Sequence, residues 1–403
     1  MTVLVVNCGS SSVKFQLIDP DAIESGAIST PEMKRLIERI GTEIPDHTAA
    51  LAQVANQVQA HLAKSGSKLT AIGHRVVHGG AEYSEPTLIT DEVIETIDRL
   101  SVLAPLHNPA NNDGIRAAGR SFPGLPQVAV FDTAFHATIP RAHRTYAVPE
   151  TWERDYSVRR YGFHGTSHAF VSRKCAKWLE KERGIQPDSA RIVVLHLGNG
   201  ASACAVAGGK SVDTSMGLTP LPGLVMGTRS GDVDPAIFGH LSRVAGMSVE
   251  EVETALNRES GMAGLCGDRD MRAVEKRVAA GDERAELAMD VYVHRIQSTV
   301  GAYVATLGGI DAIAFTAGIG ENSETVRARV AARLSGLGIS IDENLNEGRG
   351  AGPSGVRDIS ADSSAAALLV IPTNEELEIA TQTVQALSTH EPDERSTIKV
   401  RDR

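Results

Sequence analysis

The stretch Ile192-Val-Val-Leu-His-Leu-Gly-Asn-Gly-Ala-Ser-Ala-Cys-Ala-Val206 contains two apolar runs separated by a Gly-Asn-Gly turn. Short runs rich in Val, Ile and Leu that end at glycine are typical of buried β-strands. The stretch therefore predicts a β-hairpin with strands over residues 192–197 and 201–206. Its glycine spacing is similar to a dinucleotide-binding fingerprint, but that motif requires a helix after the glycines, and here a strand follows.

The same pattern occurs in two other places. Residues 3–6 and 13–19 are apolar runs around the Gly/Ser-rich turn 7–12, and the run 312–316 is followed by the Gly-rich segment 317–322 and a helix. We therefore expect a duplicated α/β fold of two lobes, each opening with a Gly-rich hairpin, with a cleft between them. Ligands of α/β proteins bind at the carboxyl ends of strands, where these turns lie.

Helices are predicted between these units. Apolar residues at steps of three and four indicate helices over residues 93–100, 289–307, 326–337 and 377–387. Residues 348–364 are rich in Gly and Ser and predict a loop, and the charged tail from residue 391 predicts a frayed end.

Composition narrows the class of protein. The 403 residues are 42% hydrophobic and 22% charged, which suits two globular domains. The net charge of −10 argues against nucleic-acid and anionic-membrane partners. The four cysteines lie far apart, no basic signal region precedes the first strand, and no apolar stretch approaches membrane length, so we expect a cytoplasmic protein.

Three Gly-rich turns after strands suit the phosphates of a nucleoside triphosphate, because exposed backbone N–H groups can hold phosphate oxygens. For a single turn, a plain tight turn is an equally good interpretation. No Walker A sequence is present: Gly209-Lys-Ser211 resembles its end, but Cys204 stands where the first glycine belongs, so we predict a hairpin turn there.

Several polar residues near the turns suit phosphate and Mg²⁺. Lys14 follows the first turn, where it could reach a phosphate, although a lone lysine is more often solvated. Asn7 and the serines at 10–12 offer oxygen ligands, and Mg²⁺ needs few of these beside water. Glu375 is a further oxygen candidate, with a first-turn helix acid as the alternative.

Two arginines lie next to glycines, in His74-Arg-Val-Val-His-Gly-Gly80 and Gly227-Thr-Arg-Ser-Gly-Asp-Val-Asp-Pro235. Arg75 and Arg229 could grip a carboxylate or phosphate with two hydrogen bonds each, which would give an acidic protein a local cation cluster for an anionic transition state. A surface salt bridge is the commoner role of either arginine taken alone.

The segment Arg160-Tyr-Gly-Phe-His-Gly-Thr-Ser-His168 brings two histidines within four residues. A zinc pair is disfavoured because no third ligand has metalloprotease spacing. His164 better suits a hydrogen-bond donor to a transferring phosphoryl group, whereas His168 is expected to pack in the following helix. His196, in the quoted hairpin, could also face phosphate. Asp132 follows an apolar run, but a carboxylate substrate is already ionised and needs no general base, so we expect it to orient other groups.

Taken together, these segments resemble the acetate kinase family. The matching runs are residues 7–14, 74–80, 105–109, 130–136, 160–168, 196–200, 227–235, 315–322 and 372–377, which span nearly the whole chain. That family belongs to the superfamily of sugar kinases, actin and ATP-driven chaperones. The resemblance implies two ribonuclease H-like lobes: residues 1–134 plus 376–403 on the substrate and metal side, and residues 135–375 binding nucleotide.

The resemblance also implies the reaction and the site. It implies reversible, direct in-line phosphoryl transfer between ATP and acetate, giving acetyl phosphate and ADP, with Mg²⁺ (or Mn²⁺ in its place) and a homodimer. The catalytic residues implied are Asp132, His164 and Arg229, and the substrate pocket Arg75, Val77, Leu106, Phe163 and Pro220. The ATP site implied is Lys14, His196, Leu197, Gly198, Asn199, Gly200, Asp268, Arg269, Asp270, Gly318, Ile319, Gly320, Glu321 and Asn322, with Asn7 and Glu375 positioning the metal.

The chain departs from the family near the adenosine. The family has an acid, one residue and then arginine, whereas this chain reads Asp268-Arg-Asp-Met-Arg272, so either Arg269 or Arg272 could supply the arginine. Two other functions are open at this point: a kinase for another short-chain acid such as propionate, and an actin- or chaperone-like ATPase. A propionate kinase would differ from an acetate kinase in the volume of its substrate pocket. One methylene group changes the discrimination between two substrates by only about 1–3 kcal/mol. An actin- or chaperone-like ATPase would not need Arg75, His164 and Arg229.

Overall fold

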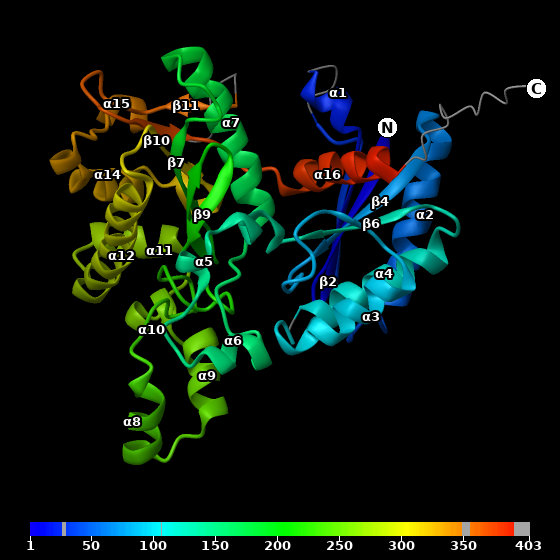
Figure 1. Ribbon diagram of the computed structural model, residues 1–403, viewed down its shortest axis with the longest axis horizontal. Helices are drawn as coiled ribbons and strands as arrows, with labels where there is room; N and C mark the ends of the chain where they lie inside the picture. The colour runs from blue at the N-terminus through cyan, green and yellow to red at the C-terminus, as the bar shows by residue number, and fades with distance from the viewer. Residues whose placement is uncertain (26–29, 106, 349–354, 391–403) are drawn as a thin grey trace, which may run out of the picture. The chain divides into compact units, whose positions relative to one another are not determined.

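The computed structural model describes residues 1–25, 30–105, 107–348 and 355–390. It divides into two compact units: one comprises Met1–Gly79, Glu85–Phe131 and the described chain from Glu376, and the other Gly80–Ser84 and Asp132–Glu375. Each unit has a mixed six-stranded sheet with helices (Figure 1), which confirms an α/β fold of two lobes. The charged tail from residue 391 lies outside the described residues.

The sheet of the first unit has the order β3-β2-β1-β4-β6-β5. Its strands are β1 (Thr2–Cys8), β2 (Ser12–Ile18), β3 (Met33–Glu38), β4 (Leu69–Val76), β5 (Thr87–Leu88) and β6 (Gln127–Phe131). The β1–β4 and β4–β6 pairs are parallel, and the other pairs are antiparallel. The predicted hairpin over residues 3–19 is therefore confirmed as β1 and β2.

The sheet of the second unit has the order β9-β8-β7-β10-β12-β11 when counted from the other edge. Its strands are β7 (Arg191–Leu197), β8 (Ala201–Ala207), β9 (Lys210–Thr214), β10 (Ala312–Thr316), β11 (Arg357–Asp358) and β12 (Ala367–Val370). The parallel pairs are again the third and fourth in the order, β7–β10 and β10–β12. The two sheets thus share one strand order and one pattern of directions, which confirms the predicted duplication.

Helices flank both sheets. The first unit has α1 (Pro20–Glu24), α2 (His47–Ser65), α3 (Asp91–Arg99), α4 (Asn108–Ser121), α16 (Glu375–His390) and a 3₁₀ turn, η1 (Leu100–Val102). The second has α5 (Arg141–Arg144), α6 (Glu150–Tyr156), α7 (Gly165–Arg183), α8 (Ala236–Ala245), α9 (Val249–Arg258), α10 (Gly261–Cys266), α11 (Met271–Ala279), α12 (Glu283–Leu307), α13 (Ala317–Asn322), α14 (Glu324–Ala332) and α15 (Glu343–Asn346), with 3₁₀ turns η2 (Ala134–Thr138) and η3 (Leu334–Leu337).

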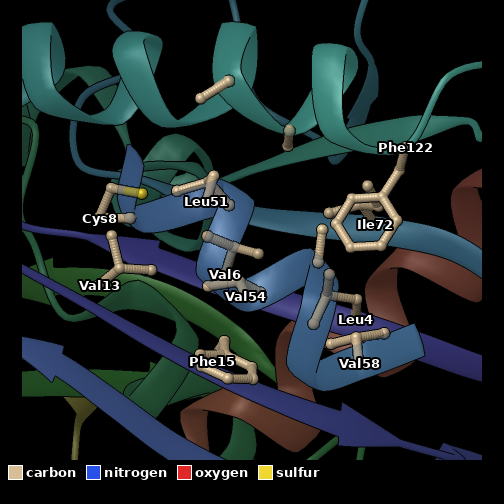
Figure 2. Close-up of a cluster of buried hydrophobic side chains, with 14 of the residues drawn as sticks. Leu4, Val6, Cys8, Val13, Phe15, Leu51, Val54, Val58, Ile72 and Phe122 are labelled. Atoms are coloured by element: carbon tan, nitrogen blue, oxygen red, sulfur yellow. The ribbon is translucent and has the colours of Figure 1, made fainter. Parts of the chain in front are cut away.

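The core of the first unit lies between its sheet and the helices α2 and α4. Side chains such as Leu4, Phe15, Leu51 and Ile72 are fully buried together (Figure 2). On β4 the next residue, Gly73, faces the opposite side, where a Cβ would lie 2.4 Å from Thr383 Oγ1 of α16. Helices therefore cover both faces of this sheet. Strands buried on both faces are typically rich in Val, Ile and Leu, which agrees with the few aromatic residues of this sequence.

In the second unit, Figure 1 shows α7 and α12 on opposite sides of the sheet. The strand β10 is buried along its whole length, as expected for a central parallel strand. The predicted helix over 289–307 is confirmed as α12, which begins with Asp282 accepting from two backbone N–H groups and ends at Gly308 in the left-handed conformation.

Three predictions of local structure were wrong in part. The Gly-rich segment 317–322 is a helix, α13, because Ala317 takes the left-handed conformation and the chain turns directly from β10 into a helical turn. The helix expected over 326–337 stops at Ala332 and continues as the 3₁₀ turn η3. Of the loop expected over 348–364, residues 349–354 lie outside the described residues, and the described part contains the short edge strand β11. Among the described residues, no helix is long and apolar enough to cross a membrane.

Candidate functional site

The site in the second unit is built on the carboxyl ends of its three parallel strands. Thr316, the last residue of β10, pairs with His196 of β7, and β12 runs parallel on the other side of β10. The segments that follow these strands are the turn 198–200, the helix α13 and the residues 371–374. Parallel pairing brings all three to one edge of the sheet, where ligands of α/β proteins bind.

A cavity of about 590 Å³ lies at this edge, within the range for small-molecule sites. Its walls come from the turn after β7, the start of α11, and helix α13. The lining residues are Gly198, Asn199, Arg269, Asp270, Met271, Arg272, Glu275, Gly318, Ile319, Asn322 and Ser323. Seven residues predicted for the ATP site therefore share one cavity: Gly198, Asn199, Arg269, Asp270, Gly318, Ile319 and Asn322.

Other predicted ATP-site residues do not line the cavity but stabilise the segments around it. Leu197 is fully buried, and the carbonyl of Gly320 accepts from the buried Arg327 at 3.0 Å. Glu321 accepts from the backbone N–H of Ala317 at 2.8 Å and of Thr373 at 3.2 Å. It thereby ties the segment after β10 to the segment after β12.

The departure near residue 268 brings both candidate arginines to the cavity. Arg269 and Arg272 line it, and Arg272 also forms an ion pair with Asp270 at 2.7 Å. Asp270 caps α11, and Asp268 accepts from the Asp270 N–H at 2.9 Å. Both arginines therefore stay candidates for contact with a bound base.

His164 and Arg229 converge over Gly200. A Cβ at Gly200 would lie 2.7 Å from Arg229 Nη2 and 3.4 Å from His164 Nε2. Arg229 Nη1 donates to the carbonyl of Pro220 at 2.6 Å, which fixes the guanidinium, and burial lowers its pKa. A Cβ here would force the Arg229 guanidinium to shift, so glycine lets a cation and an imidazole lie at one end of the turn that borders the cavity at its other end.

The loop before α7 holds His164 in an uncommon backbone conformation. His164 is the N-cap of α7 and has φ of 56°, in the left-handed region that side chains other than glycine rarely adopt. Arg160 Nη1 donates to the carbonyl of Thr214 at 2.6 Å, and His136 Nε2 donates to that of Phe163 at 2.9 Å. Such outliers persist where the surroundings over-determine them, often at functional sites.

Asp132 and Phe163 are buried in the second unit. The carbonyl of Asp132 accepts from the N–H of Gly165 at 2.9 Å, and a Cβ at Gly165 would lie 2.1 Å from that oxygen. The first turn of α7 is therefore packed directly against Asp132. This turn begins at Gly165, two residues after Phe163.

The remaining predicted substrate residues belong to the first unit. Arg75 lies near the end of β4, and Val77 follows that strand with its N–H donating to Asn111 Oδ1 at 3.1 Å. Leu106 lies outside the described residues. These residues are therefore described only within their own unit.

The predicted metal and phosphate residues have the following surroundings. Asn7 lies in β1 opposite Lys14 of β2, and Lys14 forms an ion pair with Glu376. Glu375 Oε2 accepts from Thr166 Oγ1 at 3.4 Å. The described residues contain no group of three His, Cys, Asp or Glu side chains that could hold a metal. Amide and carboxylate oxygens are nevertheless hard donors of the kind Mg²⁺ takes, with water completing its shell.

Sequence reasoning missed three residues that hold the histidines. Ser202 contacts both His164 and His168, and Ser167 joins His196 to Thr373 through bonds of 2.7 and 2.8 Å. Ser202 could have been found from the hairpin register, since the turn 198–200 places it opposite His196. Nothing in the sequence indicated Ser167 or Thr373.

The chain is similar to known proteins over nearly its whole length. A family profile described as the Acetokinase family matches residues 2–381. The chain is 54% identical to an acetate kinase of Streptomyces griseus over 399 residues, covering 94% of this chain and 95% of that protein, and 50% identical to one of Micrococcus luteus over 94% and 98%.

Two solved structures are similar over nearly their full length. The acetate kinase of Porphyromonas gingivalis has a TM-score of 0.87 at 39% identity, covering 96% of this chain and 99% of that one. The propionate kinase of Francisella tularensis has a TM-score of 0.85 at 42% identity, with 94% and 98% covered.

The half-buried carboxyl of Glu321 should make stability depend on pH. Burial raises the pKa of Glu321, outweighing its hydrogen bonds to the backbone, so the folded state favours the protonated form. Its contribution is present at low pH and is lost as pH rises through the folded pKa. Glu321→Gln stays neutral, so its melting temperature relative to wild type should be higher near pH 8 than near pH 5. Equal differences at both pH values in thermal unfolding would contradict this.

Proposed function

The chain belongs to the acetokinase family and is a kinase that transfers phosphate to acetate, and we propose that it does so by direct in-line, reversible transfer from ATP. A carboxylate oxygen of acetate forms a bond to the γ-phosphorus as the bond to the leaving ADP oxygen breaks. The products are acetyl phosphate and ADP. The observation that supports this proposal most directly is the position of the turn 198–200. Gly198 of this turn lines the cavity, and the side chains of His164 and Arg229 lie above Gly200.

The chemistry needs positioning and charge stabilisation more than covalent catalysis. In-line transfer spreads negative charge over the phosphoryl oxygens, and a fixed guanidinium with a neighbouring N–H donor stabilises such charge in a dry site. We assign these roles to Arg229 and His164, and the ATP phosphates to the turn that lines the cavity. Asp132 orients the cations, because acetate is already ionised.

The remaining assignments follow the family resemblance. We assign the substrate carboxylate to Arg75 and its methyl group to Val77, Leu106, Phe163 and Pro220. Asn7 and Glu375 would position Mg²⁺, which supplies charge neutralisation at the phosphates when bound. Chelation should abolish turnover, and Mg²⁺ or Mn²⁺ should restore it; turnover in excess chelator would contradict a metal requirement.

The first test is acyl phosphate formation from ATP and Mg²⁺, trapped with hydroxylamine, across formate, acetate, propionate and butyrate. We expect a clear preference for acetate. A preference for propionate would support the second candidate, which the similarity to the Francisella tularensis propionate kinase favours. ATP hydrolysis without product from any acid would overturn the proposal in favour of a plain ATPase.

The cation above the turn can be tested in two ways. Arg229→Ala should lower kcat by about 100-fold or more, the loss seen when a charge-stabilising donor is removed. Gly200→Ala should displace Arg229 Nη2, which would lie 2.7 Å from the new Cβ, and lower kcat by about 10- to 100-fold. Because Arg229 can swing away, the melting temperature should change little.

Gly301→Ala is the matched control, because a Cβ on this residue of α12 meets nothing within 4 Å. It should keep full activity. Wild-type kcat in Gly200→Ala would show that the close approach has no catalytic role.

We further propose a homodimer. Helix α8 has no buried residue although Ile237, Phe238, Leu241 and Val244 make it apolar, and Val244 is 66% exposed. Apolar helices of this kind mark interaction surfaces. Phe238→Asp with Val244→Asp should convert the dimer to a monomer in sedimentation equilibrium, whereas Val102→Asp, at an exposed position of the first unit, should not. A monomeric wild-type protein would contradict the proposal.

Localisation in the cytoplasm is also proposed. All four cysteines are free and buried, as in proteins of reducing compartments. Cell fractionation that finds the protein outside the cytoplasm would contradict this.

A further inference from the structure

Four imidazoles lie together in the second unit behind the turn 198–200. The rings of His164 and His196 stack with centroids 4.2 Å apart, and His168 lies 6.5 Å from His164 and 5.6 Å from His136. His136, His168 and His196 are buried. The hydrogen bonds among these rings decide which of their nitrogens carry protons.

Ser202 connects two of the rings. Its hydroxyl lies 2.9 Å from His164 Nδ1 and 2.8 Å from His168 Nε2, and the side chain is fully buried. A serine hydroxyl has one proton, so it can donate to only one of these nitrogens. It must accept from the other, and the chain of hydrogen bonds therefore has a direction.

His168 sets that direction. Burial, with His136 and His196 nearby, holds the pKa of His168 well below its ordinary value, so the ring is neutral. Its Nδ1 is buried and makes no hydrogen bond with the described residues. A proton there would be an orphaned buried N–H, which folded proteins rarely contain. The proton of His168 therefore lies on Nε2 and is donated to Ser202.

The direction of the other hydrogen bonds follows from this. Ser202 has accepted from His168, so its own proton goes to His164 Nδ1. With Nδ1 an acceptor, the single proton of neutral His164 lies on Nε2. This nitrogen lies on the side of Gly200 and Arg229, where the Cβ at position 200 would be 3.4 Å from it.

We propose that Ser202, oriented by His168, is a positioning residue that holds His164 as a neutral hydrogen-bond donor with its Nε2–H directed to the space it shares with Arg229. This inference rests on the proposed function, because it assigns a purpose to the donor. In this tautomer Nε2 has no lone pair for attack on phosphorus. His164 can donate to the transferring phosphoryl group but cannot accept it there.

His136 shows the same arrangement one step away. Its Nε2 donates to the carbonyl of Phe163, so its Nδ1 accepts from Ser211 Oγ at 2.8 Å. Burial lowers the pKa of His136 to about 4, and the ring stays neutral. A second serine–histidine pair thus fixes the backbone immediately before His164.

Kinetics with matched variants test the role of the hydroxyl. Ser202→Ala should lower kcat by about 10- to 100-fold, the range seen when the orienting partner of an active-site group is lost. KM for ATP and acetate should change less than about twofold, since ground-state binding is untouched. Ser202→Thr should restore most of the rate. Ser172→Ala, at another buried serine of the same unit whose hydroxyl donates to the carbonyl of Ala169 within α7, should behave as wild type.

A second pair of variants covers the case in which Ser202→Ala folds poorly. His168→Gln keeps an N–H donor near the position of Nε2 and should keep most of the rate, whereas His168→Met should lose it. A kcat for folded Ser202→Ala within twofold of wild type, or equal rates for the two His168 variants, would overturn the proposal.

Nitrogen-15 NMR of histidine-labelled protein reads the tautomer without any turnover. The His164 signals, assigned with His164→Gln, should show a protonated Nε2 in wild type and a mixture of tautomers in Ser202→Ala. A wild-type His164 protonated on Nδ1 would overturn the inference. Absence of acyl phosphate with the wild-type enzyme would instead overturn the proposed function, while the NMR result would still decide the tautomer.

Discussion

The parallel pairing of β10 with β7 on one side and β12 on the other is the constraint on which the site depends. Because parallel strands end at one edge, three segments distant in sequence meet there. Two side chains then hold the edge together. Glu321 bonds to the backbone after both β10 and β12, and Ser167 links His196 of β7 to Thr373. The cavity and the His164–Arg229 pair are consequences of this arrangement.

The turn after β7 has glycine where the catalytic groups approach its backbone most closely. Gly200 lies beneath Arg229 and His164 so closely that a methyl group would displace the guanidinium. Two residues further on, Ser202 contacts the other nitrogen, Nδ1, of His164. A single hairpin thus provides the floor of the site, a wall of the cavity and the hydroxyl that orients the imidazole. Such economy explains how a few short segments can position an anionic transition state in an acidic protein.

Much of the fold was accessible from sequence because it depends on local patterns. The hairpin of β7 and β8, the duplicated lobes and helix α12 follow from apolar periodicity and glycine positions. The glycine content of segment 317–322 predicts a turn, because glycine content cannot distinguish a turn from a helical turn entered through a left-handed Ala317. The edge strand β11 has only two residues, too few for a periodic signal.

The candidate site was predicted by residue type more than by geometry. Family resemblance supplied the candidates, and seven of the proposed ATP residues line one cavity. The serines that orient the imidazoles were not predicted, because a buried serine has no pattern of its own and Ser167 acts through residues far away in sequence. Hydrogen-bond direction arises only when the partners of each nitrogen are known.

The central claim is that His164 and Arg229 stabilise a phosphoryl group that passes directly from ATP to acetate. The stereochemical course at phosphorus tests this most directly, with ATP made chiral at the γ-position by oxygen isotopes. Direct transfer predicts inversion of configuration in acetyl phosphate. Retention would require two successive displacements through a phosphorylated side chain, and it would contradict the account of His164 as a donor.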